Sequence, residues 1–584
     1  IMSSDWSSDV CSSDLSSRGQ DRNGEAARFR GAAAGGRHDA GAAAGEHDPA
    51  GVCGEGADRG GDLVLLGSGA ARAEDAEDRE GEGRGEFEGH RGLREDDSGE
   101  GSRRRLEMIS ESMIPWSIMI HPFHDRTREL DALLDHWSSG RAELLVVYGR
   151  RRIGKTYLLR RFSGTRPAVY YTAARLPETQ QLREIGVLFG DHLDDDLLRE
   201  NGFRDWDQLL RLLGRLEDRI LLVLDEYPYL VESSPGLSSR LQRAWDERLL
   251  KTEHMIVLCG SSVGMMERET MDAAAPLHGR RTGHLKLEPM AAPDAAAFVP
   301  RWGEDDVVRA YAAFGGVPHY LAMLDDSESL ADNIERTMIR LGAPLRDEVE
   351  FLLRQELNEP RVYFGVLAAI AAGRRKMSEI VNATGMPHGS ISKYLAVLQH
   401  LGIVEREVPV TEARPEKSKK GLYRIVDPFV RLWMRHLLPI RGLLEAGREV
   451  EACGLVLEGL ERSAPEVYEE ICRGLVRSGA LDRVTGRRWA RAGRWWDRTH
   501  EIDVLAFTPD DETILVGEAK WSSRAVGVDI LDRLISSADN LPGDLPERPR
   551  HLVLFSRSGF TDAVLSRAES DPTLTLVRGL DAVD

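Results

Sequence analysis

The chain has 584 residues, which is too many for a single hydrophobic core, so three or four domains are expected. Its formal net charge of −20 argues against a protein that coats nucleic acid along its whole length, although a local basic face is compatible with it. The five cysteines form no CxxC or Cys/His cluster, and no apolar run reaches about 18 residues, which excludes disulfide scaffolds, structural zinc and membrane spans. We therefore expect a cytoplasmic protein without a secretory signal peptide.

Residues 1–107 are rich in Gly, Ala, Arg, Glu and Asp and show almost no apolar periodicity. Such a segment cannot bury enough surface to offset its conformational entropy, which predicts disorder. A second interpretation is an artefact, because "DWSSDVCSSDL" (residues 5–15) looks like a translated sequencing adapter and the stretch after it looks like a GC-rich sequence in the wrong frame. In that case Met108, Met113 or Met119 is the expected start.

The segment "GRRRIGKT" (residues 149–156) follows an apolar run at 144–148 and precedes the helix-forming "TYLLRRF". It meets the pattern G-x-x-x-x-G-K-[ST], in which glycines let the backbone wrap phosphates and a helix N-terminus faces the anion. This predicts a nucleotide site in which Lys155 reaches the β- and γ-phosphates and Thr156 coordinates Mg²⁺. The whole loop is expected to bind the nucleotide, through Gly149, Arg150, Arg151, Arg152, Ile153 and Gly154.

A second apolar run, "RILLVLDEYPYL" (residues 219–230), ends in Asp225 and Glu226. A strand that is apolar on both faces belongs in a buried parallel sheet, and ligands bind at the carboxyl ends of such strands. Asp225 is therefore expected to hold Mg²⁺ through water, and Glu226 to orient and deprotonate the attacking water. Two solvated acids at a strand end are the alternative, which the phosphate loop upstream makes improbable.

The third apolar run, "HMIVLCGSS" (residues 254–262), also ends in polar residues. Ser261 is a candidate sensor of the γ-phosphate or the attacking water, but either Ser261 or Ser262 equally fits a helix N-cap, so both interpretations are open. In "PLHGRRTGHLKLEPM" (residues 276–290), Arg281 and its neighbour Arg280 are candidates to contact a phosphate in cis or from a neighbouring subunit. Surface arginines are the alternative.

With "FHDRTRELDAL" (residues 123–133) and "FGGVPHYL" (residues 314–321), these motifs resemble, in order, the archaeal-type ATPase family of the AAA+ and signal-transducing ATPase group. The resemblance implies an α/β P-loop core with a parallel sheet over residues 120–290, a helical lid over 291–345, and ATP with Mg²⁺ as cofactors. It also implies that Phe123 and Arg126 lie near the adenine and that Pro318 contacts the nucleotide. From the residues alone, Gly-Gly-x-Pro is a turn between helices.

Residues 350–430 read as three short helices followed by two strands around the loop "TEARPEKSKK", which is the winged-helix arrangement. The third helix would present Ser390, Ser392, Lys393 and Tyr394 to a groove of double-stranded DNA, with Lys417, Lys419 and Lys420 touching phosphates. Glu405, Glu407 and Glu412 weaken that case. DNA contact and a role as a protein–protein spacer are both open.

The segment "DPFVRLWMRHLLP" (residues 427–439) resembles the start of a C-terminal domain that accompanies these ATPases, and residues 440–584 resemble the PD-(D/E)XK restriction-nuclease fold. A helix with Glu469 or Glu470, a strand with Asp503 and a strand with Glu518 and Lys520 carry that resemblance. Alternation puts Glu518 and Lys520 on one face of their strand.

Phosphodiester hydrolysis needs carboxylates for Mg²⁺ and a cation beside the nucleophile. The resemblance implies Glu469, Asp503 and Glu518 as metal ligands and Lys520 as the catalytic cation. Trp489, Trp495 and Trp496 either stack on bases or pack in the core. Two functions follow: an ATP-hydrolysing enzyme that couples turnover to DNA binding or processing, and a nucleotide-dependent switch whose nuclease fold is inactive and serves for docking.

Overall fold

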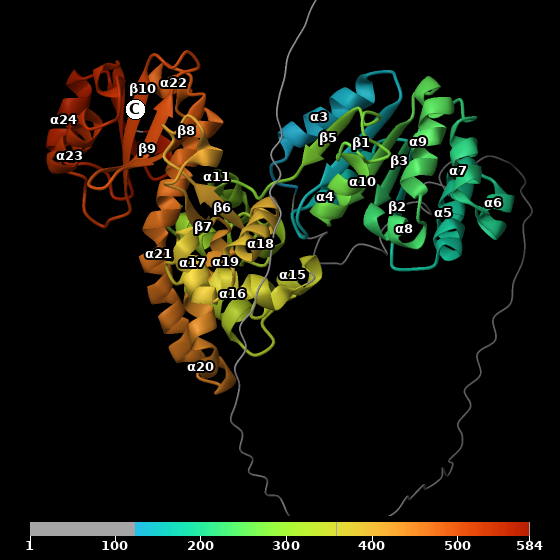
Figure 1. Ribbon diagram of the computed structural model, residues 1–584, viewed down its shortest axis with the longest axis horizontal. Coiled ribbons are helices and arrows are strands. Elements are labelled where there is room, and N and C mark those ends of the chain that lie inside the picture. Colours follow the sequence, from blue (N-terminus) through green and yellow to red (C-terminus); the bar gives the residue numbers. More distant parts are fainter. Residues whose placement is uncertain (1–122, 358, 583–584) are drawn as a thin grey trace, which may run out of the picture. The chain divides into compact units, whose positions relative to one another are not determined.

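The computed structural model describes residues 123–357 and 359–582 (Figure 1). The predictions for residues 1–107, and the first three residues of the predicted core, lie outside these ranges. Within them, no helix is both long enough and apolar enough to cross a lipid bilayer. The described residues form a five-stranded sheet, a six-stranded sheet and a two-stranded wing.

The first sheet is fully parallel, with the strand order β2-β3-β4-β1-β5. Every residue of its three central strands is buried, as the uninterrupted apolar runs predicted, whereas the two outer strands alternate between buried or half-buried and more exposed residues. The strands are β1 (Glu143–Tyr148), β2 (Ala168–Thr172), β3 (Leu221–Asp225), β4 (Met255–Gly260) and β5 (Gly283–Lys286). This arrangement confirms the predicted α/β fold class with a parallel-sheet core.

Helices accompany this sheet in the order of the chain (Figure 1). They are α3 (Thr127–Ser138), α4 (Lys155–Ser163), α5 (Glu178–Leu193), α6 (Asp196–Asn201), α7 (Trp206–Leu213), α8 (Tyr227–Ser233), α9 (Leu237–Glu247), η2 (Leu249–Lys251) and α10 (Val263–Thr270). Their buried residues recur at helical spacing, as on α7, where Trp206, Leu209, Leu210 and Leu213 face the core.

A small helical region follows the sheet. It comprises α11 (Ala292–Ala295), η3 (Ala296–Phe298), α12 (Glu304–Phe314), α13 (Pro318–Leu321), α14 (Leu330–Ile334), η4 (Glu335–Ile339) and α15 (Glu348–Glu356). Between α12 and α13, Gly316 lies against the backbone of Met290, where an added Cβ would come within 2.0 Å of the Met290 carbonyl oxygen. This glycine therefore allows the α13 segment to approach the end of the sheet closely.

The three helices and two antiparallel strands predicted from the middle of the chain are present. They are α16 (Pro360–Ala371), α17 (Met377–Thr384), α18 (His388–His400), β6 (Val404–Glu407) and β7 (Leu422–Ile425), with the turn η5 (Pro415–Lys417) in the wing loop. The short segments α19 (Pro428–Leu432), η6 (Trp433–Leu437), η7 (Leu438–Ile440) and α20 (Arg441–Glu445) then lead to the 30-residue helix α21 (Glu449–Ser478).

The second sheet has six strands in the order β13-β12-β11-β10-β9-β8 and mixes parallel and antiparallel pairs. Helix α21 packs against β8, β9 and β10, and α23 packs against β9 and β10 (Figure 1). The remaining elements are α22 (Asp482–Thr485), β8 (Arg491–Trp496), β9 (Glu501–Phe507), β10 (Ile514–Lys520), α23 (Val528–Asp539), η8 (Leu545–Glu547), β11 (Arg550–Ser556), α24 (Asp562–Ser570), β12 (Leu574–Arg578) and β13 (Asp581–Ala582).

Candidate active sites

The phosphate loop (residues 149–156) joins β1 to α4 in a conformation that requires glycine at both ends. Gly149 has φ +152°, and a Cβ there would lie 2.5 Å from the carbonyl oxygen of Leu287. Gly154 has φ +92° and precedes the first residue of α4. The Lys155 ammonium donates to the carbonyl oxygens of Gly149 and Arg150, both at 2.9 Å. The ammonium thus lies inside the loop, where a phosphate would compete for its donors.

A hydroxyl–carboxylate pair links this loop to the end of β3. Thr156 Oγ1 donates to Asp225 Oδ2 at 2.8 Å, and the Asp225 side chain is buried. The phenolic hydroxyl of Tyr170, from β2, donates to the same oxygen at 2.7 Å. Mg²⁺ prefers hydroxyl, carboxylate and water oxygens, so Thr156 and Asp225 fit the ion that the sequence predicted here.

Glu226 and Ser261 lie together at the ends of two neighbouring strands, β3 and β4. Ser261 Oγ lies 3.0 and 2.9 Å from the two carboxylate oxygens of Glu226, and the Ser261 backbone N–H donates to one of them at 3.3 Å. Glu226 has φ +53°, a left-handed conformation that costs a non-glycine residue about 1–3 kcal/mol. Ser262, not Ser261, occupies the N-cap of α10, and its side chain makes no capping bond.

Part of the phosphate loop, together with Glu226 and Ser261, lines one cavity of about 330 Å³. This size is within the range of small-molecule sites. Its polar end contains Lys155, Thr156, Glu226 and Ser261, together with Arg151, Arg152, Ile153 and Gly154. The other walls are largely aromatic and apolar, formed by Phe123, His124, Arg126, Tyr157, Met290, Phe298, Pro318, His319 and Ala322. The Phe123 and Tyr157 rings stack at 5.5 Å between centroids. The same cavity thus has charged groups suited to phosphates and aromatic rings suited to a flat base.

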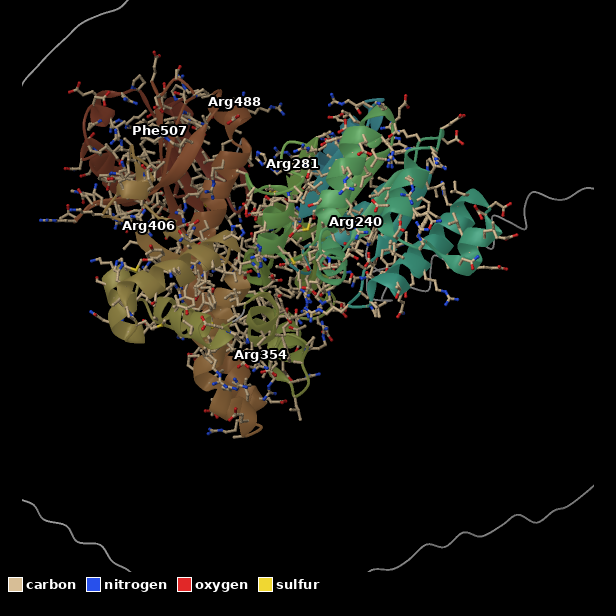
Figure 2. All side chains as sticks on the ribbon, turned by 45° about the vertical axis from the view of Figure 1, so that its right-hand side comes forward. Arg240, Arg281, Arg354, Arg406, Arg488 and Phe507 are labelled. Carbon is tan, nitrogen blue, oxygen red and sulfur yellow. The ribbon has the colours of Figure 1, made fainter. Side chains whose placement is uncertain are left out.

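Two predicted nucleotide-binding arginines are placed differently from each other. Arg126 lines the cavity, but its guanidinium is buried and donates to the carbonyl oxygens of Ile153 at 3.3 Å and Glu288 at 2.7 Å, so it supports the phosphate loop. Arg281, labelled in Figure 2, is not among the residues that line the cavity. It precedes β5, whose Gly283 pairs with Leu145, so its backbone lies toward the amino end of β1, away from the phosphate loop.

The remaining loop arginines make contacts with later parts of the chain. Arg150 is buried and forms a 2.7 Å ion pair with Asp427, the N-cap residue of α19. The guanidinium of Arg151 donates to Gln355 on α15 and to the Tyr229 hydroxyl, each at 3.0 Å. Arg152, which has φ +68°, forms a 2.7 Å ion pair with Glu348 on the same helix. The phosphate loop therefore contacts α15 and α19 through its arginine side chains.

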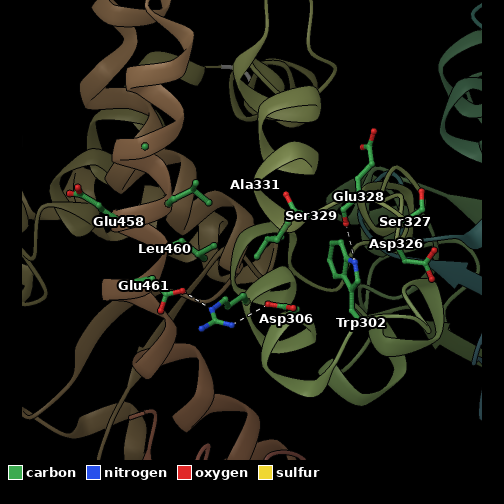
Figure 3. Close-up of a pocket in the computed structure, with 14 residues that line it drawn as sticks. Trp302, Asp306, Asp326, Ser327, Glu328, Ser329, Ala331, Glu458, Leu460 and Glu461 are labelled. Carbon is green, nitrogen blue, oxygen red and sulfur yellow. Dashed lines mark hydrogen bonds and ion pairs between the residues drawn. The ribbon is translucent and has the colours of Figure 1, made fainter.

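A larger open groove of about 750 Å³ lies beside α12 and α21, and Figure 3 shows its lining residues. Five carboxylates face it, and Arg309 bridges two of them, donating to Asp306 at 3.1 Å and to Glu461 at 2.6 Å. The others are Asp326, Glu328 and Glu458. Because these charges would repel a triphosphate, this groove does not suit a nucleotide.

In the C-terminal sheet, β9 and β10 bring the predicted acidic residues together with Lys520. Asp503 Oδ2 accepts a hydrogen bond from the Ala519 backbone N–H at 3.0 Å. Lys520 Nζ lies 3.9 Å from Asp503 Oδ2 and donates to Glu518 Oε1. Burial and the neighbouring Asp503 carboxylate raise the pKa of Glu469, on α21, to about 7. These four residues therefore form one electrostatic cluster.

Glu470 is separate from this cluster, because it pairs with Arg431 at 2.7 Å and also contacts Arg424. This resolves the alternative between Glu469 and Glu470 in favour of Glu469 as the neighbour of Asp503. Asp503 and Glu518 are suitable ligands for a divalent cation. However, within residues 123–357 and 359–582 no three His, Cys, Asp or Glu side chains are gathered as a metal centre would require. Asp503 and Glu518 thus offer two carboxylates of the kind that a divalent cation binds, and Glu469 does not complete a set of three within the described residues.

Comparison with known proteins identifies three regions. A model of an ATPase domain found predominantly in Archaea matches residues 123–324, an IclR helix-turn-helix model matches 363–408, and a model of archaeal and bacterial proteins of unknown function matches 433–530. An uncharacterized protein of Methanocaldococcus jannaschii is 31% identical over 404 residues, which cover 68% of this chain and 87% of the relative. The chain belongs to this archaeal ATPase family.

Other similar proteins match parts of this chain. An uncharacterized ATP-binding protein of M. jannaschii is 45% identical over 40 residues, covering 7% of this chain and 68% of that protein. The Walker-type ATPase of Pyrococcus abyssi has 21% identity and a TM-score of 0.43, covering 55% of this chain and 99% of its own. The ORC2 protein of Aeropyrum pernix has 15% identity and a TM-score of 0.36, covering 58% of this chain and 97% of its own.

Several side chains predicted to face DNA have other contacts in this ATPase. Tyr394 donates to Glu359 at 2.7 Å and packs edge-on against Tyr363, and Lys420 pairs with Glu412 at 2.8 Å. Trp489 and Trp495 are buried, which corresponds to the core-packing alternative. Lys393, Lys417 and Lys419 are exposed. All four lysines predicted to contact DNA are thus exposed, and one of them, Lys420, is already paired with Glu412.

Three residues that contact the phosphate loop or Asp225 were not predicted from the sequence. Tyr170 was missed because β2 (AVYYT) is apolar but contains no motif that marks a site. Asp427 and Glu348, the partners of Arg150 and Arg152, follow the loop by 277 and 196 residues, so no local pattern connects them. The spaced acids of α15, including Glu348 and Glu356, were a signal for a helix that faces basic residues.

Proposed function

We propose that this ATPase binds ATP with Mg²⁺ in the 330 Å³ cavity and hydrolyses it. The observation that carries the proposal is the position of Glu226 and Ser261 in the same cavity as Lys155 and Thr156, at the carboxyl ends of adjacent strands. Lys155 would contact the β- and γ-phosphates, and Thr156 and Asp225 would hold Mg²⁺. When bound, Mg²⁺ supplies positive charge that offsets the charge of the phosphates.

Glu226 is the proposed general base. Its carboxylate would accept a proton from the water that attacks the γ-phosphorus, and the Ser261 hydroxyl would fix the orientation of that carboxylate. Arg126 would keep the loop in place through the Ile153 carbonyl. Pro318 and His319 of α13 would close on the ligand from the helical lid.

We further propose that ATP binding is coupled to the C-terminal parts of the chain through Arg150. Its partner Asp427 begins α19, and Arg431 on the same helix pairs with Glu470 and Glu466 of α21. Glu470 adjoins Glu469 in the C-terminal cluster. A second contact supports the coupling, because Asp305 of α12 pairs with Arg557 at 2.6 Å, beside Trp521, which follows Lys520. A triphosphate that attracts Arg150 would weaken the first of these contacts.

The downstream activity that we propose is DNA binding followed by phosphodiester cleavage. The match of residues 363–408 to a helix-turn-helix domain and the exposed lysines of the wing support DNA binding. In the cleavage step, Asp503 and Glu518 would hold a divalent cation, with Glu469 next to them. Lys520 would stabilise the charge that develops on the scissile phosphate.

One observation favours a second function, a nucleotide-dependent switch without nuclease activity. The Lys520 ammonium pairs with Glu518 and lies 3.9 Å from Asp503, so it neutralises the carboxylates that a cation would need. In this alternative the C-terminal sheet docks a partner, and ATP changes the position of the winged helix.

The test uses the full chain and three lysine variants. Lys155→Ala is expected to abolish ATP binding and turnover, whereas Lys251→Ala, which changes an exposed lysine on η2, is expected to leave both unchanged. Mg²⁺-dependent nicking of a supercoiled plasmid is then measured with and without ATP. Nicking that is lost in Lys520→Ala supports the nuclease. Absence of nicking with every nucleotide supports the switch, and ATP turnover by Lys155→Ala would overturn the proposed ATPase site.

A further inference from the structure

Asp225 is held by more partners than the phosphate-loop pattern requires. Its Oδ2 atom accepts hydrogen bonds from Thr156 Oγ1 and from the Tyr170 hydroxyl, and its Oδ1 atom accepts one from the Glu226 backbone N–H at 3.0 Å. The side chain is 1% exposed. With three donors on two oxygens, the carboxylate is fixed in a single orientation.

Tyr170 is built into this position from the neighbouring strand. In the pairing of β2 with β3, Thr172 lies opposite Asp225, and Tyr170 lies two residues earlier on the same face of the strand. The Arg160 guanidinium of α4 covers its ring at 3.9 Å from the centroid. Packing from α4 and the bond to Asp225 therefore fix both the ring and its hydroxyl.

The chemistry of the pair gives Tyr170 a constant role as a donor. The phenol has a single O–H, and it donates this hydrogen to Asp225 Oδ2 at 2.7 Å. A donor that always points at one carboxylate oxygen holds that carboxylate beside Thr156, whose side chain lines the cavity. Partners that orient a metal-binding group in this way affect metal affinity or activity by about 10–100-fold when they are removed.

We propose that Tyr170 is a positioning residue for ATP hydrolysis, whose hydroxyl orients Asp225 toward Mg²⁺. The inference rests on the proposed ATPase function. It assigns Tyr170 to the magnesium requirement of the reaction and not to recognition of the nucleotide, because Tyr170 is not among the residues that line the cavity. Removing the hydroxyl is therefore expected to change the response to Mg²⁺ and to leave nucleotide binding without Mg²⁺ unchanged.

The adjacent residue Tyr171 provides a matched control. It too donates to a carboxylate, and its ring is buried where that of Tyr170 is half-buried. Its hydroxyl, however, bonds to Glu184 at 3.0 Å, outside the site. Tyr170→Phe and Tyr171→Phe each delete one hydroxyl from the same strand. A general loss of packing or stability would affect both variants, and a loss of magnesium positioning would affect Tyr170→Phe only.

The experiment titrates Mg²⁺ in an ATPase assay with the full chain and measures ADP binding in EDTA. For Tyr170→Phe we expect the Mg²⁺ concentration that gives half-maximal turnover to rise about 10–100-fold. ADP binding in EDTA should be unchanged. For Tyr171→Phe we expect wild-type values. If Tyr170→Phe reaches half-maximal turnover at the same Mg²⁺ concentration as the wild type, the inference is overturned.

Two further measurements keep the test decisive. If Tyr170→Phe is too unstable for turnover assays, the increase in Tm that Mg²⁺ adds to ADP is measured instead, because a ligand that binds only the folded state raises Tm. The inference expects a smaller increase than in the wild type, and an equal increase would overturn it. If the wild type does not hydrolyse ATP, the proposed function fails, and the same Mg²⁺-dependent increase still tests Tyr170.

Discussion

At the residue scale, Asp225 and Glu226 are adjacent carboxylates with different surroundings. Asp225 is held by Thr156 and Tyr170, which suits a residue that orients a cation. Glu226 contacts Ser261 and lines the cavity, where a water molecule can reach it. Both acids lie at the carboxyl end of β3, but their different neighbours suit them to different roles.

Glu226→Gln is expected to bind ATP with unchanged affinity and to hydrolyse it at least about 100-fold more slowly, because general-base catalysis contributes about 10²–10⁴-fold. ATP binding is measured by calorimetry and turnover by phosphate release. Glu232→Gln, which changes a half-exposed acid on α8, is the control and should keep the wild-type rate. Turnover by Glu226→Gln at the wild-type rate would remove Glu226 as the base.

At the element scale, β1 is anchored at its start as well as at the phosphate loop. Glu143, its first residue, has a fully buried side chain that contacts Arg141 at 2.9 Å and His136 at 2.8 Å. Burial raises the pKa of Glu143, but hydrogen bonds from Thr282, Arg141 and His136 outweigh it and lower the pKa to about 2. The ionised carboxylate therefore stabilises the folded chain.

The sign of the pH dependence follows from this depressed pKa. The stabilisation is complete above the ordinary value of 4.5 and is lost as the pH falls toward about 2. Glu143→Gln is expected to lower the free energy of unfolding by up to about 3 kcal/mol at pH 7, and the difference should shrink below pH 4.5. Urea unfolding at several pH values measures it, with the exposed Glu253→Gln as control. A difference that is constant with pH would contradict the prediction.

At the scale of the whole molecule, buried ion pairs connect the phosphate loop to the C-terminal sheet. Arg150 pairs with Asp427, and Arg431 pairs with Glu470, with both arginine side chains nearly inaccessible to water. Arg473, one turn further along α21, donates to the Asp503 carbonyl at 2.9 Å. Removing one partner of a buried ion pair costs about 3–5 kcal/mol. We therefore expect α19 and α21 to change position by breaking or forming whole pairs and not by small continuous shifts.

Asp427→Asn tests the first link of this connection while keeping the α19 cap, since asparagine caps helices as well as aspartate. In the wild type, an ATP analogue with Mg²⁺ is expected to change hydrogen exchange in α19 and in residues 466–473. In Asp427→Asn that change should be absent, although the analogue still binds. Asp246→Asn, which alters a surface pair with Arg280, is the control. An unchanged response in Asp427→Asn would show that Arg150 does not carry the coupling.

The sequence predicted those parts of the fold that depend on neighbours along the chain. Strands β1, β3 and β4 were visible because burial on both faces demands uninterrupted apolar residues. The phosphate loop was visible because its glycines and Lys155 must follow one another within eight residues. Strand β2 contains no such motif, and the contact of Tyr170 with Asp225 lies 55 residues away along the chain, so Tyr170 was missed.

By itself, then, the sequence determined the α/β core, the phosphate loop and the residue types of both candidate sites, because local spacing dictates backbone geometry there. Only the tertiary structure decided which side chains meet. It joined Arg150 to Asp427 across 277 residues, joined Tyr170 to Asp225 across 55, and left Arg281 out of the residues that line the cavity. Such contacts depend on how strands and helices are ordered in space, and pairing between distant segments leaves no repeat or spacing in the chain.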